Sequence, residues 1–236
     1  MPIQTIHAGY RKETDLMQWF TSDLHFAHPH VAKLRGFDDY REHDETIIRN
    51  LNELVAPDDD LYVLGDISSG SKDSVEEALR LLHRLNVGRT HRVLVLGNHD
   101  TTRLEAGKMR RFITEFSQVA LRGTTTIHGY GNVLLSHYPY ANHLDDGPHD
   151  GLSTNATSNR FQHLAIPDDA HSLLLHGHTH ATIPDEFNDP RQINIGLDAW
   201  ELKPVNETSI ISLLVNNGEY AKRTGWETQI FYKKYA

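Results

Sequence analysis

The strongest constraint in this sequence is a pattern that occurs five times, in which a short apolar run ends directly in side chains able to bind a metal ion. The five segments are residues 20–25, 64–66, 96–100, 135–137 and 176–180. In open α/β sheets, ligand sites lie outside the carboxyl ends of the strands. If each apolar run is a strand, the polar residues that follow the five runs can converge on one site.

The residue types in these segments limit the chemistry of that site. The chain has no cysteine, so it can form neither a disulfide nor a thiolate metal site, and any metal must bind nitrogen and oxygen atoms. Histidine is abundant, with 17 residues, many of them in short clusters. Carboxylates, imidazoles and one amide oxygen form a ligand set that suits Mn, Fe, Zn or similar divalent ions.

Apolar periodicity predicts an α/β fold. Residues 47–55 and 75–82 have the apolar spacing of helices, as residues 104–116 do more loosely. Strands are predicted at 18–21, 61–64, 92–96, 132–136, 172–176, 192–195 and 209–215, and Asn217-Gly218 after the last of them is a hairpin signal. The strand, helix, strand order of the first half predicts parallel pairing. The strand-rich second half fits two facing sheets with helices outside.

Length and composition indicate one domain over residues 1–236, because no repeat, low-complexity tract or linker divides the chain. Residues 138–170 are the least regular part and are interpreted as a long loop or lid. No apolar run approaches the roughly 20 residues of a membrane helix. The first 15 residues lack the apolar stretch of a secretory signal, so we expect a cytoplasmic protein.

Five short motifs in a fixed order give the sequence a family resemblance. They are Asp23-Leu24-His25, Gly65-Asp66, Gly97-Asn98-His99-Asp100, His137 and Gly177-His178-Thr179-His180. Over residues 20–198 the chain resembles the calcineurin-like metallophosphoesterases, and residues 20–28 and 194–200 with Lys203-Pro204 are similar to small stand-alone bacterial and phage members. The resemblance implies a four-layer α/β/β/α double β-sandwich, which agrees with the strands predicted above.

The same resemblance implies a centre of two divalent ions, with Mn²⁺ favoured over Fe, Zn or Ni. One ion would be held by Asp23, His25 and His180, the other by Asn98, His137 and His178, and Asp66 would bridge them. Two such ions can bind a phosphate oxygen, lower the pKa of a bridging water and stabilise the charge of an in-line displacement.

Further residues have expected roles around this centre. By resemblance, His99 faces the oxygen of the leaving group as a proton donor or transition-state stabiliser, and Asp100 fixes its orientation. His28 is a candidate substrate-binding residue, with a surface helix histidine as the alternative. His176 alternates with the ligands along its strand, so its side chain should face the core. Asp198 and Trp200 are expected to close the core behind the site.

Sequence features around the motifs favour one class of phosphoesterase. Ile67-Ser68-Ser69-Gly70 follows Asp66 and Leu96 precedes Gly97, where Ser/Thr protein phosphatases carry arginine-containing blocks. The net charge of -9 argues against long duplex nucleic acid as a partner. We therefore expect a phosphodiesterase for small substrates, such as cyclic nucleotides, including 2',3'-cyclic ones. The alternatives are a phosphomonoesterase, a single-strand nuclease and a non-catalytic binding scaffold.

Overall fold

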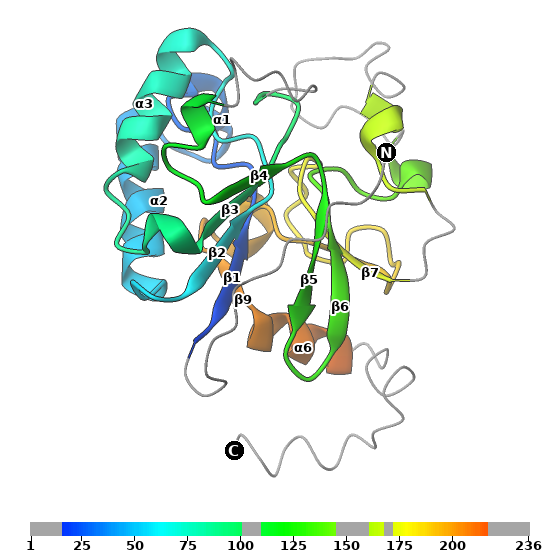
Figure 1. Cartoon of the computed structure of the whole chain (residues 1–236). Coiled ribbons are helices and arrows are strands. Elements are labelled where there is room, and N and C mark those ends of the chain that lie inside the picture. Colours follow the sequence, from blue (N-terminus) through cyan, green and yellow to red (C-terminus); the bar gives the residue numbers. More distant parts are fainter. Residues whose placement is uncertain (1–15, 101–109, 145–160, 168–171, 217–236) are drawn as a thin grey trace.

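Two β-sheets form the centre of the computed structural model, which describes residues 16–100, 110–144, 161–167 and 172–216 (Figure 1). The first sheet has the order β4-β3-β2-β1-β9 and the second has the order β5-β6-β7-β8. The strands of the first sheet are β1 (Gln18–Thr21), β2 (Asp60–Val63), β3 (Arg92–Val95), β4 (Gln118–Ala120) and β9 (Val205–Asn206). The strands of the second are β5 (Gly123–Ile127), β6 (Gly131–Leu135), β7 (Leu173–His176) and β8 (Gln192–Asn194).

Parallel pairing aligns the strand ends that matter for the site. Strands β1 to β4 pair in parallel, and so do β6, β7 and β8, while β9 and β5 lie antiparallel at sheet edges. The carboxyl ends of β1, β2 and β3 therefore lie on one edge of the first sheet, and those of β6 and β7 on one edge of the second.

Side chains alternate between two apolar layers along the strands of the first sheet, as strand geometry requires. Trp19 and Leu61 point toward the helices, whereas Phe20 and Tyr62 point toward the second sheet, where Val133 and Leu175 meet them. The inner layer is thus a core between two sheets. The predicted double β-sandwich is confirmed.

Helices α2 (Tyr40–Leu54) and α3 (Lys72–Leu82) cover the outer face of the first sheet, and α1 (Pro29–Leu34) packs beside α2 (Figure 1). The predicted helices at 47–55 and 75–82 are confirmed by α2 and α3, except that Val55 is the extended residue after the end of α2. On the outer face of the second sheet, Leu134 and Leu174 pack against Tyr140 and Ile166 from irregular segments. Short 3-10 turns there are η2 (Ala141–His143) and η3 (Gln162–Leu164), and η1 (Arg89–His91) and η4 (Leu197–Trp200) lie elsewhere.

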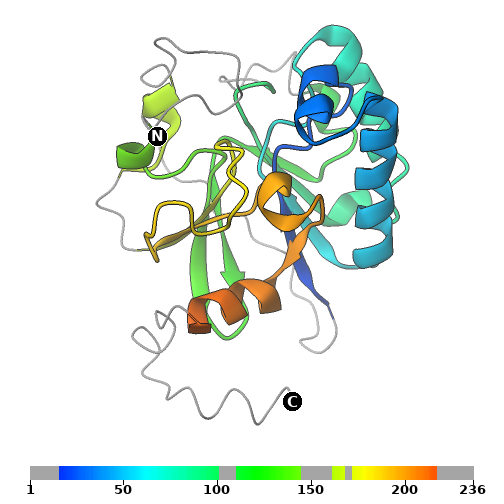
Figure 2. The ribbon, with the colours of Figure 1, turned by 180° about the vertical axis from the view of Figure 1, so that it is seen from behind.

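The predicted strand at 209–215 is wrong, because these residues form helix α6 (Glu207–Asn216) at the lower end of both sheets (Figure 2). Asn206 Oδ1 accepts a hydrogen bond from the Ser209 N–H (2.8 Å), which caps the helix. Ile210, Ile211 and Leu214 are buried on one helical face. The β-branched isoleucines in this segment favour a strand in the sequence. In the structure, the Asn206 cap and the burial of one helical face favour a helix instead. The Asn217-Gly218 hairpin signal lies outside the described residues.

Two more predictions fall only partly on residues that the structure describes. The described end of the predicted 104–116 helix is helical at residues 110–112. Of the predicted 138–170 lid, residues 145–160 and 168–170 lie outside the described ranges. Strands β4, β5 and β9 were not predicted. In the described ranges, no helix is long and apolar enough to cross a membrane.

Candidate metal centre

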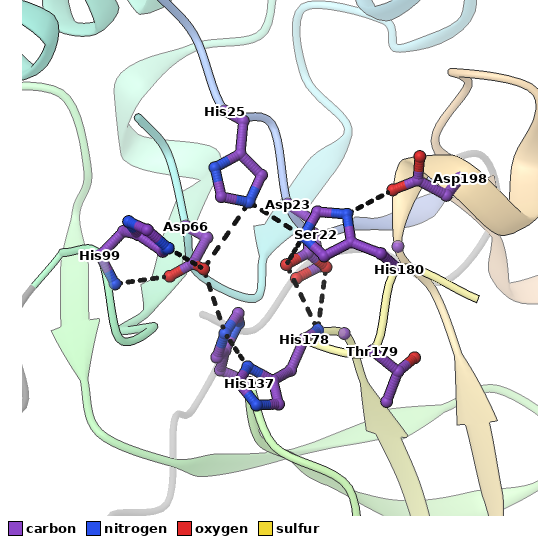
Figure 3. A network of polar contacts seen from close by, with 12 residues as sticks. Ser22, Asp23, His25, Asp66, His99, His137, His178, Thr179, His180 and Asp198 are labelled. Carbon is purple, nitrogen blue, oxygen red and sulfur yellow. Dashed lines mark hydrogen bonds and ion pairs between the residues drawn. The ribbon is translucent and has the colours of Figure 1, made fainter. Parts of the chain in front are cut away.

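The polar segments after five strands converge on one point between the two sheets (Figure 3). Asp23 and His25 follow β1, Asp66 follows β2, and Asn98 and His99 follow β3. His137 follows β6, while His178 and His180 follow β7. The edge of each sheet thus supplies part of one site, as the repeated sequence pattern predicts.

An unusual backbone conformation aims these side chains. Five of the residues have left-handed φ angles, which non-glycine residues rarely adopt, and they are Asp23 (59°), His25 (47°), Asp66 (53°), His178 (74°) and His180 (53°). Each such residue costs about 1–3 kcal/mol and persists only where its surroundings hold it, and such strain clusters at functional sites. Backbone hydrogen bonds from Asp23 N to Gly65 O (3.0 Å) and from His25 N to Asp66 O (2.9 Å) hold two of these turns.

Two glycines make room for the carboxylates. A Cβ atom on Gly97 would lie 2.1 Å from Asp66 Oδ1, and a Cβ atom on Gly177 would lie 2.3 Å from Asp23 Oδ2. No side chain fits at such distances. The glycines of the Gly-Asn-His-Asp and Gly-His-Thr-His segments are therefore needed because the backbone approaches the carboxylates closely.

One group of ligand atoms, which we call the first ligand set, consists of Asp23, His25 and His180. Their ligand atoms all lie within 4.8 Å of one another. The Nε2 atoms of His25 and His180 are 3.2 Å apart, and His180 Nε2 is 4.0 Å from Asp23 Oδ1. Asp66 Oδ2 lies beside this set, 3.7 Å from His25 Nε2.

The second ligand set consists of Asn98, His137 and His178. His137 Nε2 lies 3.0 Å from Asn98 Oδ1 and 3.2 Å from His178 Nδ1. Asp66 Oδ2 is 3.5 Å from the same His137 nitrogen. The single Asp66 oxygen is therefore close to both sets, the position that a bridging carboxylate needs.

The distances and protonation of these groups fit divalent ions. Two ligand atoms about 2.1 Å from one ion lie about 3.0–3.4 Å apart in tetrahedral or adjacent octahedral positions. The His25–His180, His137–Asn98 and His137–His178 separations of 3.2, 3.0 and 3.2 Å match this range, and the 4.0 Å between His180 Nε2 and Asp23 Oδ1 is longer. His137 Nδ1 donates to Leu64 O (2.7 Å) and His180 Nδ1 donates to Asp198 Oδ2 (2.8 Å). In the neutral form that binds a metal ion, each ring then has its Nε2 lone pair facing the other ligand atoms.

Electrostatics favour charge separation around Asp66. Burial opposes ionisation of Asp66, but His137 and His25 lower its pKa well below the usual range. Burial likewise opposes protonation of His137, but the Asp66 carboxylate raises its pKa to about 9. The site thus holds a buried anion that attracts positive charge, and a proton or a metal ion can supply it.

His99 and Asp100 lie beside this anion in different roles. The His99 N–H donates to Asp66 Oδ1 (2.9 Å), and His99 Nδ1 donates to Ser69 O (3.2 Å). The Asp100 carboxylate instead accepts from the N–H groups of Asp66 (2.8 Å), Ile67 (3.0 Å) and Gly97 (2.9 Å). The prediction that Asp100 fixes the orientation of His99 is therefore corrected. Asp100 joins the backbones of two ligand loops.

Two other histidines have clear positions. His28 caps α1 through its Nδ1 atom and is only 9% exposed, with ring centroids 5.2 Å from His25 and 6.1 Å from His99. It is thus a buried neighbour of the site and not a surface histidine. His176 is 1% exposed, donates to Gly177 O and faces away from the ligands, so its predicted core position is confirmed.

Sequence reasoning missed the part played by Arg35 and misplaced Asp198. The Asp198 carboxylate does not merely close the core, because it accepts hydrogen bonds from Arg35 and from the His180 ring. Trp200 does pack against the core between the sheets, with its Nε1 donating to Asn194 O (2.8 Å). The position of Asp198 two residues after Gly196, in the segment similar to phage relatives, was the available signal.

Comparisons with known proteins agree with this site. Residues 18–211 match the family described as calcineurin-like phosphoesterase. The Gene 66 protein of Mycobacterium phage D29 is 38% identical over 200 residues, which cover 80% of this chain and 92% of that protein. The Gene 66 protein of Mycobacterium phage L5 is 35% identical over 194 residues, covering 77% of this chain and 86% of that protein.

A solved structure shares the fold. The crystal structure of AQ665 from Aquifex aeolicus, a protein of unknown function, aligns with a TM-score of 0.57 and 26% identity over 84% of this chain and all of that one. The chain belongs to the calcineurin-like phosphoesterase family. Membership identifies its reaction class as metal-dependent hydrolysis of phosphoesters, and it leaves the particular ester open.

Proposed function

We propose that this chain is a two-metal phosphodiesterase for small substrates, with cyclic nucleotides, including 2',3'-cyclic ones, as the candidate class. The observation that carries the two-metal part is the position of Asp66 Oδ2, which lies 3.7 Å from His25 Nε2 in one ligand set and 3.5 Å from His137 Nε2 in the other. Asp23, His25 and His180 would hold one ion, Asn98, His137 and His178 the other, and Asp66 would bridge them. Mn²⁺ is the proposed metal.

When bound, the two ions supply a hydroxide at neutral pH and neutralise the charge that develops on the phosphate. Asp66 stays ionised, so it can hold both ions without giving up a proton first. His99 commits Nδ1–H to Ser69 O, and its Nε2 lies 3.9 Å from Asp66 Oδ2 with the side chain 23% exposed. We propose that this nitrogen exchanges a proton with the leaving-group oxygen. His28 lies beside it as a proposed substrate contact.

A pair of stacked aromatic rings beside the second ligand set favours a nucleotide as the substrate. Phe161 stacks on Tyr138 with centroids 5.7 Å apart, and both rings lie near His178, at 6.4 Å and 5.0 Å. Phe161 is the outer and only partly buried ring of this pair. Nucleobases stack on such rings with about 1–3 kcal/mol per base. The same stack keeps the single-strand nuclease as the second candidate function.

A substrate panel tests the proposal. The protein is freed of metal with a chelator and reloaded separately with Mn²⁺, Fe²⁺, Zn²⁺ or Ni²⁺. Turnover is then measured on bis(p-nitrophenyl) phosphate, 2',3'- and 3',5'-cyclic nucleotides, p-nitrophenyl phosphate and a short single-stranded oligonucleotide. We expect the fastest turnover with Mn²⁺ and on the small diesters. Cleavage of the monoester alone would overturn the proposal, and cleavage of the oligonucleotide alone would favour the nuclease.

Phe161→Ala tests the nucleobase contact within the same panel. We expect KM for cyclic nucleotides to rise, because a stacking surface is lost, while KM for bis(p-nitrophenyl) phosphate changes less. A binding scaffold would show no turnover with any metal. The Asp66→Ala variant, which removes the bridging group, shows whether any turnover belongs to this site.

A further inference from the structure

Arg35 is a buried cation that contacts Asp23 of the first ligand set and the Asp198 carboxylate behind His180. It follows the last residue of α1, and its side chain is only 4% exposed. A buried guanidinium is stable only when its donors are paired. Arg35 Nε and one terminal nitrogen form a fork on the two Asp198 oxygens, at 2.9 Å and 2.7 Å. That terminal nitrogen also donates to the backbone oxygen of Asp23 (2.8 Å).

The Asp198 carboxylate links Arg35 to the metal ligand His180. His180 Nδ1 donates to Asp198 Oδ2 (2.8 Å), which leaves Nε2 of the neutral ring as the acceptor nitrogen, 3.2 Å from His25 Nε2 (Figure 3). A carboxylate on the far nitrogen fixes the orientation of a ligating histidine and raises its basicity. Arg35 therefore reaches two members of the first ligand set, Asp23 through its backbone and His180 through Asp198.

A second branch holds the loop that carries His25. Arg35 donates to His43 Nε2 (3.0 Å), so His43 Nδ1 carries the proton and donates to Asp44 Oδ1 (2.8 Å). The other Asp44 oxygen accepts from the Ala27 N–H (2.9 Å). Ala27, like Asp23 and His25, has a left-handed φ angle. The strained loop is thus held at Asp23 and at Ala27, with His25 between the two points.

The charges of this network also matter to a bound cation. Arg35 alone would repel an ion at the first ligand set, and Asp198 lies between Arg35 and His180 with one oxygen shared by both. The Asp198 carboxylate accepts two hydrogen bonds from the Arg35 guanidinium and one from the His180 ring, so its negative charge lies next to the positive charge of Arg35. Asp198 therefore offsets the positive charge and orients the ligand at the same time.

We propose that Arg35 and Asp198 are positioning residues that set the metal affinity of the first ligand set separately from that of the second. The inference rests on the proposed two-metal function and adds to it two residues that no ligand motif contains. The second ligand set has its own support, because His137 Nδ1 donates to the backbone oxygen of Leu64 and not to a side chain.

Metal titrations of single-site variants test this proposal. The His178→Ala variant leaves the first ligand set as the better site, and His180→Ala leaves the second. Mn²⁺ is titrated into each metal-free variant, and free Mn²⁺ is followed by electron paramagnetic resonance. We expect Asp198→Asn to weaken Mn²⁺ binding about 10- to 100-fold in the His178→Ala background, the range for a lost partner of a metal-binding histidine. In the His180→Ala background we expect less than about a threefold change, because the Asp198 side chain contacts Arg35 and His180 and not the second ligand set.

A matched control and a second variant keep the test decisive. Glu45→Gln makes the same chemical change in an exposed fork with Arg84 (2.6 and 2.7 Å), and it should leave Mn²⁺ binding unchanged. Arg35→Lys keeps the charge but loses the fork on Asp198, so it should weaken the first site in the same selective way. It decides the question if Asp198→Asn does not fold, as judged by thermal unfolding of the metal-free proteins.

Equal weakening in both backgrounds, or no change in either, would overturn the inference. A wild-type protein that binds no Mn²⁺ would instead contradict the proposed function itself. A wild-type protein that binds two ions, with unaltered binding in Asp198→Asn and Arg35→Lys, would remove only the positioning role.

Discussion

The two ligand sets contain similar residue types, but different parts of the chain hold them. In the first set, Asp23 and His180 are held by the side chains of Arg35, which directly follows α1, and of Asp198 in η4. In the second, His137 at the end of β6 is oriented by the Leu64 carbonyl at the end of β2. Side-chain support can be removed by one substitution, whereas backbone support survives most of them. The first set should therefore be the more easily disturbed half of the site.

Asp66→Ala should have the largest effect, because it removes the one group that lies beside both halves. Both ions should bind more weakly and hydrolysis should fall by well over the roughly 10- to 100-fold typical of a lost partner of a metal ligand. Metal content and kcat/KM measure the two effects, with Glu45→Ala as an exposed control. If only one ion were lost, Asp66 would be a ligand of one set alone, which would contradict a carboxylate shared by the two sets.

His99→Ala should separate chemistry from metal binding. Loss of a proton donor lowers turnover about 10²- to 10⁴-fold, and the metal content should stay as in the wild type. His99 also forms a possible metal group with His25 and Asp66. If the variant lost an ion, His99 would be a ligand and the first set would have a fourth member.

Alanine at the two tight glycines should disturb the halves differently. In Gly97→Ala the new Cβ meets Asp66 Oδ1, and in Gly177→Ala it meets Ser22 Oγ at 2.1 Å and Asp23 Oδ2 at 2.3 Å. Overpacking of this kind costs about 1–3 kcal/mol. We expect Gly97→Ala to weaken the binding of both ions, and Gly177→Ala to weaken mainly the binding of the ion at the first ligand set. Gly88→Ala, whose Cβ would lie 3.1 Å from the His91 ring and 3.4 Å from Pro57 O, is the control for denaturant unfolding and Mn²⁺ titration.

The smallest effect concerns His176 on β7, behind the second set. Burial lowers its pKa to about 4, from about 6.5 in an unfolded chain, so protons bind the unfolded state more strongly. The contribution of neutral His176 to the free energy of unfolding is fully present above pH 6.5 and is lost as the pH falls toward 4. About 1 kcal/mol of it is lost by pH 6. His176→Asn keeps a donor for Gly177 O and should show a flatter denaturant midpoint between pH 7.5 and 6. An unchanged slope would exclude His176 as the source.

Local patterns account for the parts of the molecule that the sequence predicts well. Short apolar runs such as 18–21 and 172–176 mark buried strands, and ligand types directly after them mark the site, because both signals lie within a few residues. The prediction of a strand at residues 209–215 was wrong because an apolar β-branched run is compatible with a strand or with a buried helix. Packing against both sheets stabilises the helix here.

The supports of the site were less predictable, because they join distant positions. Arg35 contacts Asp198, 163 residues away, and no local spacing signals such a pair. Asp100 was assigned to His99, its neighbour in sequence, although its carboxylate accepts from backbone groups 33 and 34 residues away. Motifs therefore identify the ligands, while the groups that hold them depend on the tertiary fold.

Anomalous diffraction from crystals of the Mn²⁺-loaded protein tests the central claim most directly. Two peaks are predicted, one among Asp23, His25 and His180 and one among Asn98, His137 and His178, with an Asp66 oxygen bound to both. A single peak, or two peaks that do not share Asp66, would contradict the two-metal centre.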